Sequence, residues 1–366
     1  MKNIEFKQLV SLLCNADLGI NYSETEWSEC ILILREAKLL GRLYYQAVNQ
    51  GCYKKYPEFV QRHLYSASVH AKRQAHQVVF EAELITRTLA KIGVTPTFLK
   101  GASYTLRNSG NSLGRICSDI DLLVAKEELE KVEAHLKTKL WRSEELSEYD
   151  DKYYREWAHE IPPMFHPIRN TVLDIHHNLY LPISGRSPNI SLFLQHVSYV
   201  GSGVRVLNEP VTVLHSIIHL FMNEDFTNAF RDLLDIHLLI EQYENPEFWK
   251  KLCYVSDSSG FGRELYYCLS LRGSIFLYPQ PECFEALQSK YKNWRTDFFI
   301  KHVLSHAITP KHSLLDNYQT KNGRFLVFLR GHYLKMPLSV LIKHLTIKSL
   351  TGMVDSLFGK HFLEKS

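Results

Sequence analysis

Residues 94–124 read VTPTFLKGASYTLRNSGNSLGRICSDIDLLV and decide the fold that we expect for this chain. A short apolar run meets Lys100 and Gly101, a stretch compatible with a helix follows, and a second apolar run carries an Asp-Ile-Asp triplet. Alternate side chains of a strand share one face. We therefore expect Asp119 and Asp121 to project together from a strand whose other face is buried.

This aspartate pair implies a cation. Two carboxylates side by side repel by roughly 1–4 kcal/mol at ~4 Å, in an effective dielectric of ~80–20. A fold accepts this repulsion most easily when a cation lies between them, and Mg²⁺ is the usual one where phosphates are present. An Asp-x-Asp pair alone is weak evidence. Here it lies in a strand pattern, a Gly-turn-helix precedes it, and Asp174 follows within a second strand-like run, 171–177.

The residue types in this order indicate chemistry at phosphorus. Gly101, between a strand and a helix, lets the backbone approach phosphates, and the helix N-terminus offers free N–H groups. Ser103 adds a hydroxyl. Asp119 and Asp121 are predicted to hold the divalent ions, Mg²⁺ or Mn²⁺, that bridge a triphosphate. Asp174 is predicted to complete the metal site or to act as general base on an attacking hydroxyl.

Length and composition set broader limits. The 366 residues suffice for two or three domains, and 45% apolar and 22% charged residues are ordinary for a globular protein. A net charge of +4 fits an anionic substrate without indicating nucleic acid. We expect no transmembrane helix, because no window has ~18 uncharged apolar residues. The N-terminal stretch is interpreted as a folded helix rather than a signal peptide. Seven scattered cysteines without a CxxC pair favour reduced thiols in a cytoplasm.

The chain divides into three regions by its hydrophobic pattern. Residues 1–92 are predicted to be helical, with one helix from Ser23 to about residue 49, and to flank or cover a site. Residues 93–208 alternate strand-length apolar runs with helical stretches, and 209–366 are mostly helical. We therefore predict an α+β fold, in which a small mixed β-sheet core lies between large helical N- and C-terminal regions.

Three side chains near the acids have two interpretations each. Arg115 either binds a phosphate or pairs with Asp119 or Asp121. Lys100 either contacts a phosphate or forms a salt bridge to one of the acids. His176 either orients substrate or a metal-bound water, or is a hydrogen-bonded, half-buried histidine.

Two sets of residues further along the chain are ambiguous as well. His215 and His219 lie four apart on a predicted helix, but the Glu of HExxH is missing, so we expect packing or a substrate contact rather than zinc. Asp235 is expected to cap or pair structurally, and a substrate contact is the alternative.

These motifs also resemble a known family. Leu99-Lys-Gly-Ala, Arg115-x-x-x-Asp-Ile-Asp-Leu-Leu-Val and Leu173-Asp-Ile-His are similar to the nucleotidyltransferase superfamily related to DNA polymerase β, and within it to a little-characterised bacterial branch. The segments 214–219 and 231–237 resemble that branch too, so the resemblance covers roughly residues 60–240.

The resemblance implies specific roles. Gly101 would be the phosphate-turn glycine, Asp119 and Asp121 the metal ligands, and Asp174 the third acid. Lys100 and Arg115 would be cations on the phosphate side, in contact with the nucleotide.

The implied activity is transfer of a nucleoside monophosphate from an NTP, with ATP as the default, to an unidentified hydroxyl or phosphate on a small molecule, sugar, peptide or protein. The sequence departs from the superfamily pattern in two ways. Position 102 is Ala, so the serine, Ser103, comes one residue later, and the spacer from Gly101 to Asp119 is longer than in the better-known members. They leave a non-catalytic nucleotide-binding scaffold or regulator open, and γ-phosphate transfer is a third alternative.

Overall fold

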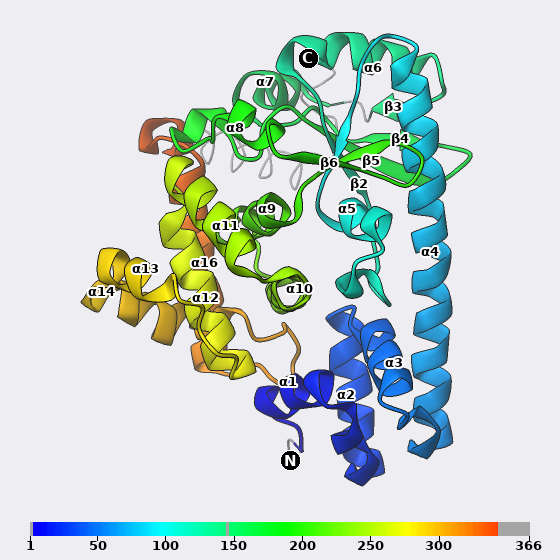
Figure 1. Cartoon of the computed structure of the whole chain (residues 1–366), viewed down its shortest axis with the longest axis vertical. Coiled ribbons are helices and arrows are strands. Elements are labelled where there is room, and N and C mark those ends of the chain that lie inside the picture. Colours follow the sequence, from blue (N-terminus) through cyan, green and yellow to red (C-terminus); the bar gives the residue numbers. More distant parts are fainter. Residues whose placement is uncertain (1–2, 144–145, 343–366) are drawn as a thin grey trace, which may run out of the picture.

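The computed structural model describes residues 3–143 and 146–342 (Figure 1). Helices occupy both ends of the described chain and one mixed sheet lies between them, which confirms the predicted α+β class. None of the described helices is long and apolar enough to cross a lipid bilayer.

The N-terminal region is helical. Its helices are α1 (Phe6–Cys14), α2 (Glu24–Glu36), α3 (Leu40–Asn49) and α4 (Glu58–Ala90). The predicted capping box is present at the start of α2, where Ser23 and Glu26 bond reciprocally. The prediction of one helix from Ser23 to about residue 49 is wrong, because Lys38 takes a left-handed φ of 58° and ends α2.

Seven described strands form one sheet in the order β3-β4-β5-β2-β1-β7-β6. Their bounds are β1 (Thr97–Phe98), β2 (Ile120–Leu123), β3 (Arg142–Ser143), β4 (Met164–His166), β5 (Thr171–His176), β6 (Val197–Val200) and β7 (Val204–Leu207). The pairs β2–β5 and β1–β7 are parallel, and the other neighbours are antiparallel. The sheet is therefore mixed, as predicted, and its central strands are those that carry the acidic motif.

Further helices connect the strands and complete the C-terminal region. Those among the strands are α5 (Lys100–Arg107), α6 (Leu129–Lys137), α7 (Glu148–Lys152) and α8 (Ile190–Leu194). Those after them are α9 (Glu209–Met222), α10 (Ala229–Tyr243), α11 (Pro246–Ser258), α12 (Gly262–Phe276), α13 (Phe284–Tyr291), α14 (Trp294–Phe298), α15 (Ser305–Ala307) and α16 (Tyr318–Lys335).

The helix α4 ties the N-terminal helices to the sheet. Val60 and Leu64, near its start, belong to the large helical core, whereas Ile85 and Leu89, near its end, pack in the core under the sheet. In Figure 1, α4 runs along one side of the molecule from α3 to the strands. A second element, α9, is buried on nearly every side. Helix α4 thus contributes to both hydrophobic cores.

Candidate active site

The register of the sheet brings two of the predicted acids together. Asp121 on β2 pairs directly with Asp174 on the parallel strand β5. Neighbouring strands lie about 4.8 Å apart, and directly opposite residues project from the same face. Asp119 precedes the first residue of β2 and lines the same cavity as Asp121. The structure thus places Asp121 opposite Asp174, with Asp119 just before the start of β2.

Asp121 is buried and contacts Lys100 and His176. Lys100 Nζ donates to Asp121 Oδ1 at 2.8 Å, and His176 Nε2 lies 2.9 Å from the same oxygen. Burial alone would raise the pKa of Asp121, but the charges of Lys100 and His176 outweigh it and hold that pKa well below its usual range. Asp121 is therefore ionised at neutral pH. Of the two interpretations of Lys100, the salt bridge to one of the acids is the one that the structure shows.

Asp174 has the opposite environment. Burial, followed by the charges of Asp121 and Glu160, raises its pKa to about 7. Within the described part of the chain, its buried Oδ1 has no hydrogen-bond partner. Such a carboxylate is costly to ionise unless a cation reaches it. The three acids are thus short of positive charge on the Asp174 side.

A histidine–glutamate cluster lies beside the acids. His176 Nδ1 is 3.1 Å from Glu160 Oε2, so its ring bridges Glu160 and Asp121. His159 completes a group whose ligand atoms lie within 4.8 Å of one another. His176 is 2% exposed, which fits the predicted hydrogen-bonded histidine except that it is fully rather than half buried. The cluster could hold a metal ion, and it also fixes the orientation of Asp121.

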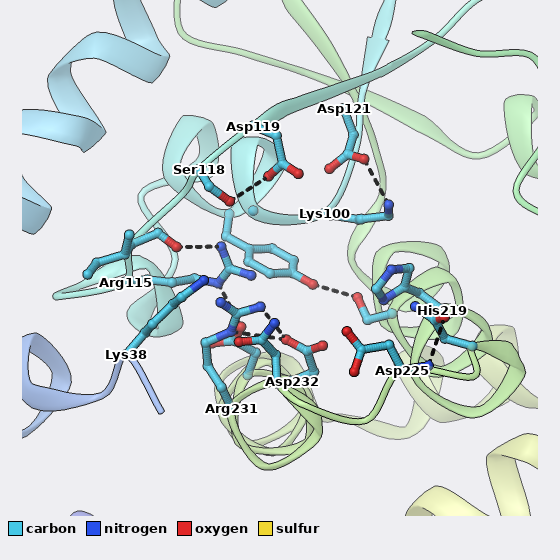
Figure 2. A pocket seen from close by; sticks show the side chains of 17 residues that line it. Lys38, Lys100, Arg115, Ser118, Asp119, Asp121, His219, Asp225, Arg231 and Asp232 are labelled. Carbon is cyan, nitrogen blue, oxygen red and sulfur yellow. Dashed lines mark hydrogen bonds and ion pairs between the residues drawn. The ribbon is translucent and has the colours of Figure 1, made fainter. Parts of the chain in front are cut away.

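A cavity of about 240 Å³ opens in front of Asp119 and Asp121. Its walls come from α5, the loop before β2, α9, α10 and the connection between α2 and α3 (Figure 2). Asp174 does not line it, because β5 lies on the side of β2 away from β1 and α5. A ligand in this cavity would therefore contact the sheet core and both helical regions at once.

The start of α5 differs in detail from a simple phosphate turn. Gly101 lines the cavity, and a Cβ at this position would lie 2.3 Å from Arg115 Nη1. The glycine thus makes room for the guanidinium. Ser103 is buried and its hydroxyl donates to the Lys100 carbonyl at 2.7 Å, so it turns away from the cavity.

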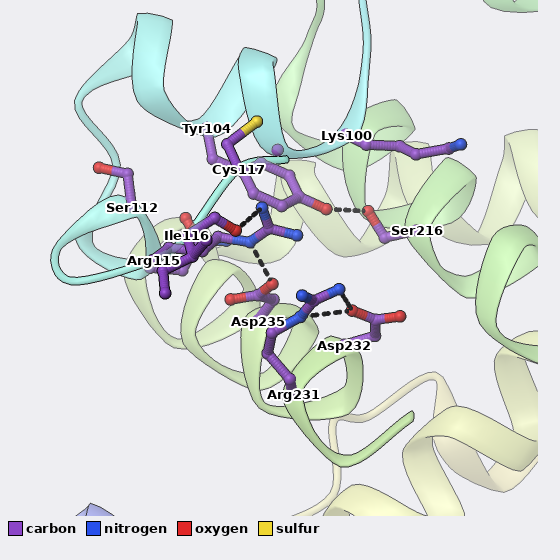
Figure 3. A network of polar contacts seen from close by, with 12 residues as sticks. Lys100, Tyr104, Ser112, Arg115, Ile116, Cys117, Ser216, Arg231, Asp232 and Asp235 are labelled. Atoms are coloured by element: carbon purple, nitrogen blue, oxygen red, sulfur yellow. Dashed lines mark hydrogen bonds and ion pairs between the residues drawn. The ribbon is translucent and has the colours of Figure 1, made fainter. Parts of the chain in front are cut away.

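Arg115 pairs with a residue from the C-terminal region. Arg115 Nε donates to Asp235 Oδ2 at 2.7 Å (Figure 3). Neither Asp119 nor Asp121 is its ion-pair partner. The structural pairing predicted for Asp235 is present. Burial raises the pKa of Asp235 despite this partner, whereas the charge of Asp235 outweighs burial and raises the pKa of Arg115.

The wall formed by α9 and α10 is polar. Tyr104 donates its hydroxyl proton to Ser216 Oγ at 2.6 Å, since the Ser216 hydroxyl itself donates to a backbone carbonyl (Figure 3). Arg231 pairs with Asp232 at 2.9 Å. Burial lowers the pKa of His219 to about 4, so this histidine is neutral at pH 7. The wall therefore offers hydroxyl, imidazole and carboxylate groups to a polar ligand.

Sequence reasoning missed Lys38, His159 and Glu160. Lys38 reaches the cavity from the link between α2 and α3, more than sixty positions before the motif. Glu160 is positioned by an isolated β-bridge to His176, which no periodic sequence pattern predicts. A search for charged residues with no helical or strand role could have flagged Glu160, but no local signal pointed to Lys38.

Carboxylates presented by adjacent strands at the edge of a cavity, beside a helix N-terminus, are an arrangement used by enzymes that displace groups at phosphorus. The sequence comparison gives the family: residues 23–276, more than half of the chain, match the family described as "Uncharacterised nucleotidyltransferase", and the chain belongs to it. No curated protein and no solved structure matches the chain.

Proposed function

We propose that this protein is a divalent-metal-dependent nucleotidyltransferase. It moves a nucleoside monophosphate from an NTP, ATP by default, to an acceptor hydroxyl or phosphate and releases pyrophosphate. The observation that carries the proposal is the pairing of Asp121 with Asp174 across β2 and β5, beside Asp119. Family membership supports nucleotidyl transfer in general, and the acid geometry supports its metal dependence.

The residues fit a hard divalent cation. Mg²⁺ and Mn²⁺ prefer carboxylate oxygens, and Asp119, Asp121 and Asp174 supply them. The buried Oδ1 of Asp174, which has no hydrogen-bond partner among the described residues, is an oxygen that fits such a cation. Nucleotidyltransferases generally use divalent metals, which when bound neutralise the triphosphate and polarise its α-phosphorus.

The protein's own groups have separate tasks in this proposal. Asp119 and Asp121 hold the cation at the cavity, and His176 keeps Asp121 oriented from behind. The acceptor oxygen forms a bond to the α-phosphorus while the bond to the departing pyrophosphate breaks, and the acceptor's proton passes to a carboxylate. Asp174, opposite Asp121 on the neighbouring strand, either completes the metal site or takes that proton.

Phosphate recognition falls to the start of α5. Gly101 opens the helix N-terminus to the cavity, and Lys100 and Arg115 contribute positive charge there. Ser103 has no part in this version of the site, because its hydroxyl is bonded to the backbone.

The test is transfer of label from α-³²P-NTP with Mg²⁺ or Mn²⁺, across a panel of sugar, peptide and protein acceptors. We expect label transfer and stoichiometric pyrophosphate from the wild type and a loss of at least ~100-fold in Asp119→Asn, as for removal of a metal ligand or its orienting partner. Equal transfer by Asp119→Asn/Asp121→Asn would refute the proposal. Label transferred only from γ-³²P-NTP would assign γ-phosphate transfer instead.

A specific observation favours a second candidate, a non-catalytic nucleotide-binding regulator. The ammonium of Lys100 already neutralises Asp121 at 2.8 Å, as a substitute for a metal would. In that case Mg²⁺-NTP would raise the Tm, and no acceptor would yield pyrophosphate.

A further inference from the structure

Helix α2 ends in a conformation that suits glycine but carries a lysine. Lys38 has a φ of 58°, its N–H donates to the Arg35 carbonyl, and the next N–H, of Leu39, donates to Leu34. This is a Schellman ending, in which the left-handed position is usually Gly because a Cβ is strained there. Other non-glycine residues share this conformation, so the strain alone assigns no role; Lys38 is singled out because it also lines the cavity.

Close backbone packing fixes the place of Lys38. A Cβ on Gly41, in the first turn of α3, would lie 2.5 Å from Gly114 O, and a Cβ on Gly114 would lie 2.2 Å from Gly41 C. Arg42 Nη1 also donates to Gly110 O at 2.6 Å. Because only glycines permit this approach, the α2–α3 link is held against the loop that leads into Arg115.

Three cations converge on this end of the cavity. Figure 2 shows Lys38, Arg115 and Arg231 on the same side, with Lys38 extending toward the Arg115 guanidinium. Arg115 and Arg231 have carboxylate partners, Asp235 and Asp232. Within residues 3–143 and 146–342, no ion pair or side-chain hydrogen bond of Lys38 is found. Lys38 is therefore the member of this group whose charge is left for an anionic ligand.

We propose that this end of the cavity is a phosphate-binding subsite, completed by Lys38, which holds the two terminal phosphates of the NTP that leave as pyrophosphate. The assignment to the donor nucleotide rests on the proposed function. The subsite faces Asp119 across the cavity, so the α-phosphorus of a triphosphate held there would lie on the side of the acids. The N-terminal helices would then be part of the nucleotide site rather than a cover over it.

The experiment uses a variant that separates structural from binding roles. Lys38→Gly removes the ammonium and relieves the backbone strain, so its Tm should equal or exceed that of the wild type. Calorimetric titrations with Mg²⁺ use α,β-methylene-ATP, pyrophosphate and AMP as probes. We expect Lys38→Gly to bind the first two about tenfold or more weakly, the loss typical of one charge-assisted hydrogen bond, and AMP unchanged. Lys38→Arg should retain most of the affinity.

Leu277→Gly is the matched control. Leu277 also has a left-handed φ, of 54°, ends α12, and is 86% exposed away from the cavity. This variant should gain the same backbone relief and bind all three probes as the wild type does.

The outcomes separate the two proposals. Wild-type affinity of Lys38→Gly for pyrophosphate and α,β-methylene-ATP would overturn the subsite, even if the enzyme transfers nucleotide. A weaker AMP complex in Lys38→Gly would also overturn it, because AMP lacks the two phosphates. If Lys38→Gly loses pyrophosphate affinity but the wild type releases no pyrophosphate with any acceptor, the subsite stands and nucleotidyl transfer fails.

Discussion

Replacing Asp174 with Asn should stabilise the metal-free protein, and the gain should grow with pH. Asn keeps the shape of the side chain but cannot ionise. In the wild type, burial and the charges of Asp121 and Glu160 raise the pKa of Asp174 from 3.8 to about 7. The folded state therefore holds the proton more tightly than the unfolded state does. The stability that this group contributes is present below pH ~4 and is lost as the pH rises through ~7.

The magnitude follows from the pKa difference. The folded value lies about 3 above the ordinary one, and one pKa unit corresponds to about 1.4 kcal/mol, so the full loss is about 4 kcal/mol. The unfolded carboxyl is already mostly ionised at pH 5. About 2–3 kcal/mol of the loss therefore falls between pH 5 and pH 8.

Urea unfolding in EDTA at pH 5 and pH 8 measures this. The free energy of unfolding of Asp174→Asn minus that of the wild type should rise by about 2–3 kcal/mol from pH 5 to pH 8. Glu127→Gln, at an exposed carboxylate on the surface, is the control and should show no such change. Adding Mg²⁺ at pH 8 should raise the free energy of unfolding of the wild type by about 2.7 kcal/mol at 100 times its Kd. The increase should be smaller for Asp174→Asn. A difference between the two proteins that does not vary with pH would refute the assigned environment of Asp174.

Three other predictions follow from the contacts. Gly101→Ala places a Cβ 2.3 Å from Arg115 Nη1 and should cost about 1–3 kcal/mol in urea unfolding; an unchanged midpoint would contradict the packing. Arg115→Met leaves the buried Asp235 carboxylate unpaired and should cost about 3–5 kcal/mol, and Arg115→Met/Asp235→Asn should recover most of it, which a double-mutant cycle checks. Asp119→Asn/Asp121→Asn should abolish the rise in Tm that Mn²⁺ gives the wild type at pH 8, and a retained rise would place the cation elsewhere, at the His159 cluster first.

The fold and the acid pair were predictable because their signals are local. The alternation of polar and apolar residues around Asp121 and Asp174 gave two strands, and the structure has β2 and β5 there. The pattern could not show that these strands are neighbours, nor that Asp121 and Asp174 share a register, since strand order depends on the whole sheet. The first apolar run predicts a strand over 94–99, but only Thr97–Phe98 are paired, because strand length follows from the partners available.

The partners of the charged residues could not be predicted from the sequence, for a related reason. Arg115 was expected to meet a phosphate or the nearby acids, yet its carboxylate partner, Asp235, is 120 positions away on α10. No residue close to Arg115 in the sequence indicates that contact, because the contact forms only when α10 packs against the loop before β2. The same holds for Lys38, whose conformation at the end of α2 is local but whose neighbours are not. The sequence pattern thus predicts the elements that bury an apolar face. Which charged side chains line a cavity depends instead on which elements pack against one another. The family match begins at residue 23 and so includes α2 and α3 together with the strands that carry the acids.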